Sequence, residues 1–213
     1  MFETYYEKLT EFFTVGDYYQ DIYNAKQEFF EKSGIVYEED PEYETRMCLF
    51  MDWYLFERDL PGVDLPPAKL YLRTHRSQMD EETIKVYSDM TESVHSVYKV
   101  KWKRFFSKGL IVEDLFTRKI YSVNDPKIKQ SFSWGDIFEG RVIPFKGQLE
   151  FSRGFCFHPS EMRGFIMGEI KKVRFQDKTK HTKLIFQLSN MKLKHSRYNH
   201  IDVTHIYRLD SKF

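Results

Sequence analysis

The chain has 213 residues, a formal net charge of +1 and 41% apolar residues, and it is rich in Phe and Tyr. This is the composition of a soluble globular protein, with room for one large domain or two small ones. No stretch approaches the roughly 18 apolar residues that a membrane-spanning helix needs. The two cysteines, Cys48 and Cys156, exclude a disulfide framework and a zinc-ligand spacing, and we expect both to be reduced core residues.

The charge is divided between the two halves of the chain. Residues 1–96 hold nine Lys and Arg against 21 Asp and Glu, a formal charge of −12, whereas residues 97–213 hold 24 against 11, or +13. A basic half is the usual electrostatic signature of an anionic partner. An acidic half can compete with that partner for the basic half, or cover the basic half. The charge therefore indicates a class of partner, although no catalytic signature accompanies it.

Residues 1–96 are expected to form an acidic helical region. Aromatic and aliphatic residues recur there at three- and four-residue steps, as on one face of a helix. Helix starts and stops are marked by Gly, Pro and capping residues: Gly16, Gly34, Asp40–Pro41, Leu60–Gly62, Pro66–Pro67 and Ser77. The last of these helices is predicted to run to about His95.

Residues 97–158 are expected to form a small β-unit. Short segments rich in β-branched and aromatic residues alternate with turn residues: Val97–Phe106, Leu110–Leu115, Ile120–Val123, Ile137–Pro144 and Gln148–Phe157. Their number and spacing predict a small antiparallel five-strand barrel-like centre. The side chains predicted to be buried in it are Leu110, Val112, Leu115, Ile120, Val142 and Phe151. Trp134–Asp136 is predicted to be a turn that places Asp136, in a structural role, at the start of the next strand.

Residues 159–213 are expected to form a basic helical C-terminal region, because the helical period returns after Pro159. Helices are predicted from Ser160 to about Val173, around Leu184–Met191 and around Val203–Leu209. The predicted fold class is therefore α+β, with a helical N-terminal region, the barrel-like centre and a helical C-terminal region packed on it. No low-complexity linker separates the three parts.

Two segments of the centre, Gly109–Lys119 and Trp134–Pro144, resemble a small β-domain of poorly characterised bacterial proteins. In those proteins the β-domain follows a helical N-terminal part, here carrying Met51–Phe56. Some of them end in a cysteine-rich zinc-binding tail of the SEC-C type, which this chain lacks, so that zinc function is not carried over. The resemblance implies the same architecture and a bacterial origin, and it names no reaction.

The sequence gives only weak signals for metal-binding or catalytic residues. His195, His200 and His205 recur every fifth residue, whereas two histidines that share a metal on a helix lie three or four residues apart. The acidic run from Glu38 to Glu44 is better explained by solvation and by the dipole of a nearby helix start than by acid–base chemistry. We expect no metal, no cofactor and no catalytic residue, and an enzyme with residues gathered from distant segments is the third hypothesis.

The basic half offers three clusters of cations, which can neutralise phosphates without exact geometry. The first includes Lys101, Lys103 and Arg104, where Trp102 would point away from the lysines unless a bulge intervenes. The second lies at the junction of two predicted helices and consists of Lys171, Lys172, Arg174, Lys178, Lys180 and Lys183. The third consists of Lys192, Lys194, His195 and Arg197. The first two clusters are the predicted nucleic-acid-binding residues.

The leading functional hypothesis is a non-enzymatic cytoplasmic binding protein that contacts RNA or DNA through its basic half. The N-terminus lacks the basic and apolar regions of a signal peptide, and no membrane association is expected. The alternative is a protein–protein adaptor or regulatory protein, whose oppositely charged halves mediate self-association or the docking of a regulator. A purely structural alternative is also open: the basic clusters form a solvated surface, or pair with the acidic half of the same or a neighbouring molecule. Exposed cations beside exposed aromatic residues favour nucleic acid, and a large apolar patch favours the adaptor.

Overall fold

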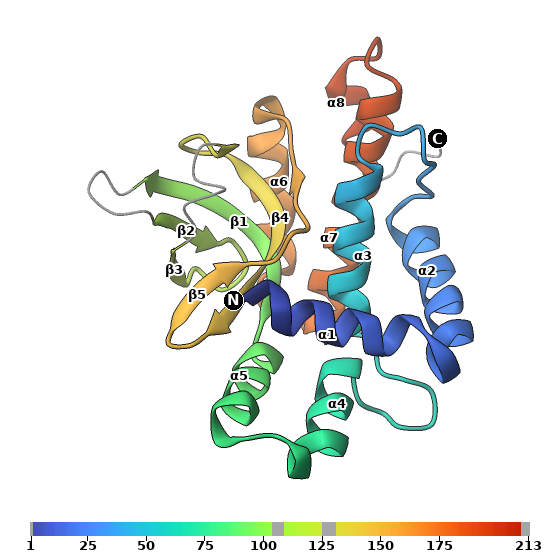
Figure 1. Ribbon diagram of the computed structural model, residues 1–213. Coiled ribbons are helices and arrows are strands. Elements are labelled where there is room, and N and C mark those ends of the chain that lie inside the picture. The colour runs from blue at the N-terminus through green and yellow to red at the C-terminus, as the bar shows by residue number, and fades with distance from the viewer. Residues whose placement is uncertain (1, 104–108, 125–130, 210–213) are drawn as a thin grey trace.

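The computed structural model describes residues 2–103, 109–124 and 131–209, and in this part of the chain eight α-helices pack around one curled antiparallel sheet (Figure 1). The helices lie at both ends of the chain and the strands lie between them. The α+β fold class is therefore confirmed.

Five helices precede the sheet. They are α1 (Phe2–Thr14), α2 (Tyr19–Ser33), α3 (Tyr43–Phe56), α4 (Pro67–His75) and α5 (Glu81–Thr91). Helix α3 begins at Tyr43, so the predicted start at Asp40–Pro41 is wrong. Asp40 instead closes a turn, because its carboxylate accepts a hydrogen bond from the Tyr37 backbone N–H at 2.7 Å. The chain becomes helical only after this turn.

Aromatic side chains fill the core between these helices. The rings of Phe13, Phe29 and Phe50 are almost wholly buried, as is the indole of Trp53. Helix α3 lies at the centre of this group, and its last five residues, Asp52–Phe56, are all buried. The high Phe and Tyr content of the chain thus serves its core, where each ring removes a large apolar area from water.

The sheet has six strands among the described residues. They are β1 (Val94–Lys103), β2 (Leu110–Asp114), β3 (Ile120–Val123), β4 (Ile137–Phe145), β5 (Gln148–Phe151) and β6 (Cys156–Phe157). The order is β3-β2-β1-β4-β5, and β6 also pairs with β4. Just after β3, the Asn124 N–H donates to the Leu149 carbonyl of β5 at 2.9 Å. The sheet therefore curls until its two edges meet, as the barrel-like prediction requires.

Three further segments of the predicted secondary structure differ from the observed one. The helix predicted to start at Ser77 starts at Glu81, because the Asp80 side chain caps it by accepting a hydrogen bond from the Thr83 N–H. Helix α5 ends at Thr91 and β1 begins at Val94, so His95 lies in the sheet and not at a helix end. The segment 148–157 forms two strands and not one, because the chain between them turns to pack on α3. A Cβ atom on Gly154 would lie 2.7 Å from the backbone nitrogen of Leu49, so this approach is possible only with glycine.

The two faces of the sheet have different neighbours. Side chains on the inner face, among them Tyr98, Val112, Phe138 and Phe151, pack against one another inside the curl. The alternating positions of β1 and β4 face outward, where helices cover them. Five of the six side chains predicted to be buried are buried: Leu110, Val112, Leu115, Val142 and Phe151.

The sixth, Ile120, is 53% exposed, so its predicted burial is wrong. In β3 the buried positions are Tyr121 and Val123, which alternate with the exposed ones. Ile120 therefore points to the outer face, on an edge strand that the helices do not reach. The predicted turn is confirmed: Gly135 has φ +82°, and Asp136 accepts a hydrogen bond from the Ser133 N–H at 2.5 Å immediately before β4.

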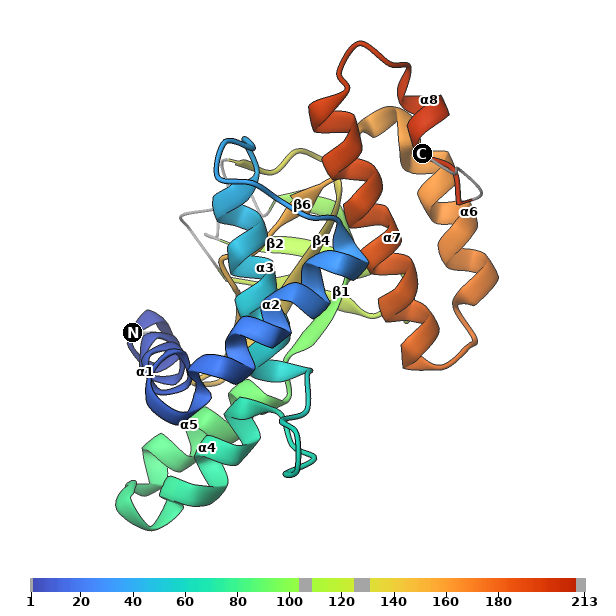
Figure 2. The ribbon, with the colours of Figure 1, turned by 90° about the vertical axis from the view of Figure 1, so that its right-hand side faces the viewer.

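Three helices follow the sheet: α6 (Arg163–Val173), α7 (Lys178–Arg197) and the short α8 (Val203–Ile206). Helices α6 and α7 lie side by side and run in opposite directions (Figure 2). Their apolar faces pack on the outer face of the sheet, where Ile166, Ile170 and Leu188 meet Val97 and Ile137. None of the described helices is both long and apolar enough to cross a bilayer.

Candidate nucleic-acid interface

The second basic cluster occupies the turn between α6 and α7, and we call it the junction surface: Lys171, Lys172, Arg174, Lys178, Lys180 and Lys183. The connection lies at the lower end of the two helices in Figure 2. Asp177 fixes the start of α7, because its side chain accepts a hydrogen bond from the Lys180 N–H at 3.1 Å. This cap places Lys178, Lys180 and Lys183 in the first two turns of α7.

The cations of the junction surface are largely uncommitted. Lys172 forms an ion pair with Glu169 at 2.6 Å, and no salt bridge joins the other five to a carboxylate of the described residues. The five lysines are exposed and Arg174 is half-buried. Phe175, next to Arg174, is 95% exposed. Cations without a salt bridge to the described carboxylates thus lie on both sides of this exposed aromatic residue along the chain.

Two of the four residues of the third cluster, Lys192 and Arg197, are paired with carboxylates within the molecule. Arg197 pairs with Asp40 at 2.5 Å, and Lys192 pairs with Glu42. The Arg197 side chain lowers the pKa of Asp40 to about 2, which keeps the carboxylate charged. The acidic half therefore covers part of the basic half on this side of the molecule, and leaves the junction surface uncovered.

The structure describes only part of the first cluster, and one of its cations is already paired. Lys101 pairs with Glu113 across the strands at 2.9 Å. Lys103 ends β1 and its side chain lies outside the described part of the chain, as does the whole of Arg104. A bulge at Lys101 shifts the pairing so that Trp102 lies opposite Ile111, on the outer face of the sheet, and is 64% exposed. The bulge named as a condition in the sequence analysis is therefore present.

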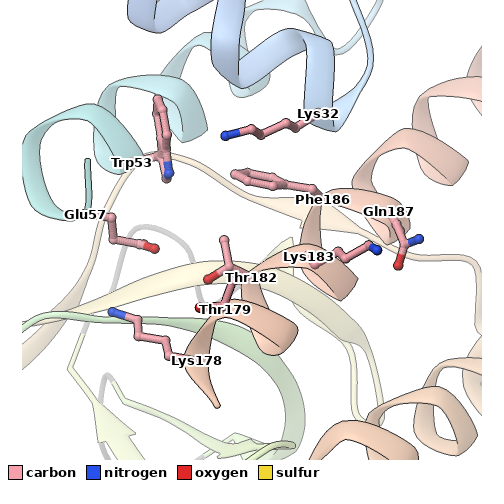
Figure 3. Close-up of a pocket in the computed structure, with 9 residues that line it drawn as sticks. All are labelled: Lys32, Trp53, Glu57, Lys178, Thr179, Thr182, Lys183, Phe186 and Gln187. Atoms are coloured by element: carbon pink, nitrogen blue, oxygen red, sulfur yellow. The ribbon is translucent and has the colours of Figure 1, made fainter. Parts of the chain in front are cut away.

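A cavity of about 620 Å³ adjoins the junction surface, between α2, α3 and the first half of α7. Its lining includes three lysines, two threonines, one carboxylate and two aromatic rings: Lys32, Lys178, Lys183, Thr179, Thr182, Glu57, Trp53 and Phe186, together with Gln187. Figure 3 shows the ammonium groups of Lys32 and Lys178 on opposite sides, with Glu57 and Thr182 pointing into the space between them. Lys178 and Lys183 belong both to the cavity and to the junction surface.

Behind the cavity, Glu57 belongs to a buried network of charges. Its Oε1 contacts Arg141 and lies 2.9 Å from His95 Nδ1, while His95 Nε2 lies 2.9 Å from Glu139 Oε1. The Ser189 hydroxyl of α7 donates to the other oxygen of Glu139. All four charged side chains are more than nine-tenths buried. One imidazole thus lies between two carboxylates in the interior.

The protonation states in this network follow from its geometry. Burial is the largest single effect and favours the neutral forms of Glu57 and Glu139. The contacts with protonated His95, together with Arg141 for Glu57 and the Ser189 hydroxyl for Glu139, outweigh burial and lower the pKa of both carboxyls. Burial also opposes the charged form of His95, yet the two carboxylates raise its pKa to about 9. At neutral pH the network therefore holds two negative charges, on Glu57 and Glu139, and two positive charges, on His95 and Arg141.

The alternation of the strands explains why these residues meet. His95 pairs with Arg141, and Val97 pairs with Glu139, in the ladder between β1 and β4. The side chains of His95, Glu139 and Arg141 therefore lie on the outer face of the sheet, under α3 and α7. Glu57 reaches them from the end of α3. No motif in the sequence predicted this network. A signal was present in Ile137–Ile143, where two charged residues two positions apart interrupt an otherwise apolar strand.

The histidines and cysteines considered as candidate ligands or nucleophiles do not gather into one site in the described part of the chain. Among the described residues, no group of three or more His, Cys, Asp and Glu side chains is placed to hold a metal ion. His195 lies in α7 and His205 in α8. Both cysteines are free, and burial raises the pKa of Cys156 to about 12, so its thiol is a poor nucleophile at neutral pH.

Residues 6–194 match the model of a family of unknown function (DUF7986). The chain belongs to this family. No curated protein and no solved structure matches it. The matched residues extend from α1 into the last turns of α7, so the junction surface and the cavity both lie inside the DUF7986 region.

Proposed function

We propose that this DUF7986 protein binds nucleic acid through the junction surface, without catalysing a reaction. The observation that carries the proposal is the group of exposed cations on both sides of Phe175 in the sequence, in a molecule where two basic residues at the other end of α7, Lys192 and Arg197, pair with its own acidic half. Each cation that neutralises a phosphate releases condensed counterions, which supplies affinity for any sequence.

The exposed ring favours single strands. Phe175 is 95% exposed on the turn between Arg174 and the start of α7. An aromatic face can stack on an unpaired base of any type, and such stacking contributes about 1–3 kcal/mol per base. A duplex presents phosphates but no free base face. We therefore expect single-stranded RNA or DNA to bind more tightly than a duplex of the same length.

The proposal includes a bacterial cytoplasmic setting. It rests on the resemblance of Gly109–Lys119 and Trp134–Pro144 to a β-domain of bacterial proteins. A cytoplasmic nucleic-acid-binding protein would meet RNA as its most abundant single-stranded polyanion.

A second candidate function, the protein–protein adaptor, is favoured by a different surface. An apolar groove of about 870 Å³ lies between the end of α2 and helices α7 and α8. Ile35, Tyr37 and Tyr198 line it, and each is about half exposed. Exposed apolar residues gathered on one face are typical of a protein-binding surface. The groove lies on the side where Arg197 is already paired, away from the junction surface.

The test is a binding titration with a fluorescent mixed-sequence strand of about 20 nucleotides, at about 50 mM salt, followed by anisotropy. Lys171→Glu combined with Lys180→Glu should weaken binding by at least about tenfold, because both residues lie on the junction surface. Lys8→Glu combined with Lys69→Glu is the matched control: it changes the net charge equally, at exposed positions on α1 and α4. Equal loss in both double variants, or no binding by the wild type, would reject the proposal and leave the adaptor.

A further inference from the structure

We propose that the cavity between α2, α3 and α7 binds a nucleoside monophosphate, either a free nucleotide or the phosphorylated end of a strand that the junction surface holds. The second source rests on the proposed function; the first does not.

The cationic part of the lining suits a phosphate monoester. Lys32 comes from the last turn of α2, while Lys178 and Lys183 come from α7, so the positive charges reach the cavity from separate elements. Thr182 adds a hydroxyl donor between them, whereas the Thr179 hydroxyl already donates to the Asp177 carboxylate. Lys32 also pairs with Glu28 at 2.8 Å, but both side chains are solvent-exposed and such pairs contribute little. A doubly charged phosphate would engage these donors more strongly than a singly charged carboxylate.

Through its attraction to Lys178, the carboxylate of Glu57 offsets only part of this positive field. Its side chain is 93% buried, and its Oε1 already contacts Arg141 and His95. The second oxygen, Oε2, remains for the cavity. A phosphate oxygen cannot donate a hydrogen bond, so Oε2 has no use for the phosphate itself. It suits an N–H or O–H donor elsewhere on the ligand, such as a ribose hydroxyl or a base amine.

The size and the apolar walls of the cavity exclude a bare phosphate as its full occupant. The volume of about 620 Å³ lies within the range of small-molecule sites, about 300–1,000 Å³. Trp53 and Phe186 form an apolar side, where their rings meet edge to face. A ligand that fills this space joins an anion to an organic group that carries hydrogen-bond donors. A nucleoside monophosphate has these three parts.

The cavity and the junction surface are continuous. Lys178 and Lys183 contribute to both, and Lys180 lies on the same two turns of α7. A strand lying on the junction surface would therefore pass the mouth of the cavity. Its terminal nucleotide, which alone carries a phosphate monoester, could enter where an internal nucleotide could not.

Two sets of variants separate the cavity from the junction surface. Thr182→Val removes a hydroxyl with little change of shape, and Lys32→Gln removes a charge; both residues line the cavity, and neither belongs to the junction surface. Lys171→Glu with Lys180→Glu is the reverse control, since neither of those residues lines the cavity. Circular dichroism and melting temperature establish that each variant is folded.

The experiment is calorimetric titration of the full chain with AMP, GMP, CMP and UMP, with the matching nucleosides and with inorganic phosphate. A second arm compares strands that differ only in a terminal phosphate. We expect at least one monophosphate to bind at least about tenfold more tightly than its nucleoside and than phosphate, and Thr182→Val and Lys32→Gln each to lose about tenfold. Lys171→Glu with Lys180→Glu should retain this binding.

The outcomes are distinct. If no free monophosphate binds but a terminal phosphate tightens strand binding in a manner that Thr182→Val abolishes, the ligand is the strand end. If neither a free nor a terminal phosphate monoester is preferred over its unphosphorylated counterpart, the inference is overturned. In that case strand binding that depends on Lys171 and Lys180 would still support the proposed function. Conversely, monophosphate binding without strand binding would reject the proposed function alone.

Discussion

Replacing His95 by Gln should remove a contribution to stability that depends on pH. The imidazole nitrogens lie 2.9 Å from Glu57 and 2.9 Å from Glu139, and these contacts raise the pKa of His95 from 6.5 to about 9. A difference of this size between the folded and unfolded protein corresponds to about 3 kcal/mol of folding free energy.

The sign follows from the direction of the shift. Because the pKa of His95 is higher in the folded protein, its contribution is complete below the unfolded value of 6.5 and is lost as the pH rises through about 9. The free energy of unfolding should therefore fall by about 3 kcal/mol between about pH 6 and pH 10 in the wild type. At pH 6, His95→Gln should destabilise by about 3–5 kcal/mol, because two buried carboxylates lose their common partner.

Urea denaturation followed by circular dichroism, at about pH 6, 8 and 10, measures both effects. The informative quantity is the difference between wild type and His95→Gln, because other groups that titrate in this range affect both proteins alike. Glu139→Gln is a second comparison: with one carboxylate removed, the pKa of His95 should fall and the loss of stability should begin at lower pH. A wild type whose stability falls no more steeply than that of His95→Gln would refute the protonated, charge-paired network.

Two further predictions concern packing, each with its own control. Leu115→Ala should cost about 2–5 kcal/mol, because the side chain is 1% exposed beneath α6 and α7, whereas Ile120→Ala, at an exposed position, should cost less than about 1 kcal/mol. Gly154→Ala should destabilise by about 1–3 kcal/mol, because its Cβ would lie 2.7 Å from the Leu49 backbone, whereas Gly164→Ala in α6, with open space around its Cβ, should be neutral or stabilising. Denaturant midpoints measure all four, and a control that costs as much as its partner would contradict the packing described.

The secondary structure could be predicted where a local pattern decides it. The strands around Val112 and Val142 alternate with turn residues, and Gly34 ends α2 at the predicted place with φ +99°. Ile120 shows the limit of this reasoning. Its residue type favours burial, but its side chain points to the outer face of β3, where none of the described helices covers it. Which face of a strand is covered depends on the tertiary arrangement.

The candidate site was only partly predictable, for a related reason. The lysines of the junction surface are close in sequence, so their proximity was visible there. The sequence did not show which basic cluster is paired: Asp40 and Glu42 bind Arg197 and Lys192 of the third cluster from more than 140 positions away. The cavity and the network around His95 join α2, α3, β1, β4 and α7, and no local pattern reports such a combination.

The salt dependence of strand binding tests the central claim most directly. For single strands the slope of log affinity against log salt is about −0.7 for each phosphate neutralised, so five uncommitted cations (Lys171, Arg174, Lys178, Lys180 and Lys183) predict a slope of about −3.5. Lys171→Glu with Lys180→Glu should reduce its magnitude by about 1.4 or more, while Lys8→Glu with Lys69→Glu should leave it unchanged. A slope near zero in the wild type, or the same slope in both double variants, would contradict the claim that the junction surface is where nucleic acid binds.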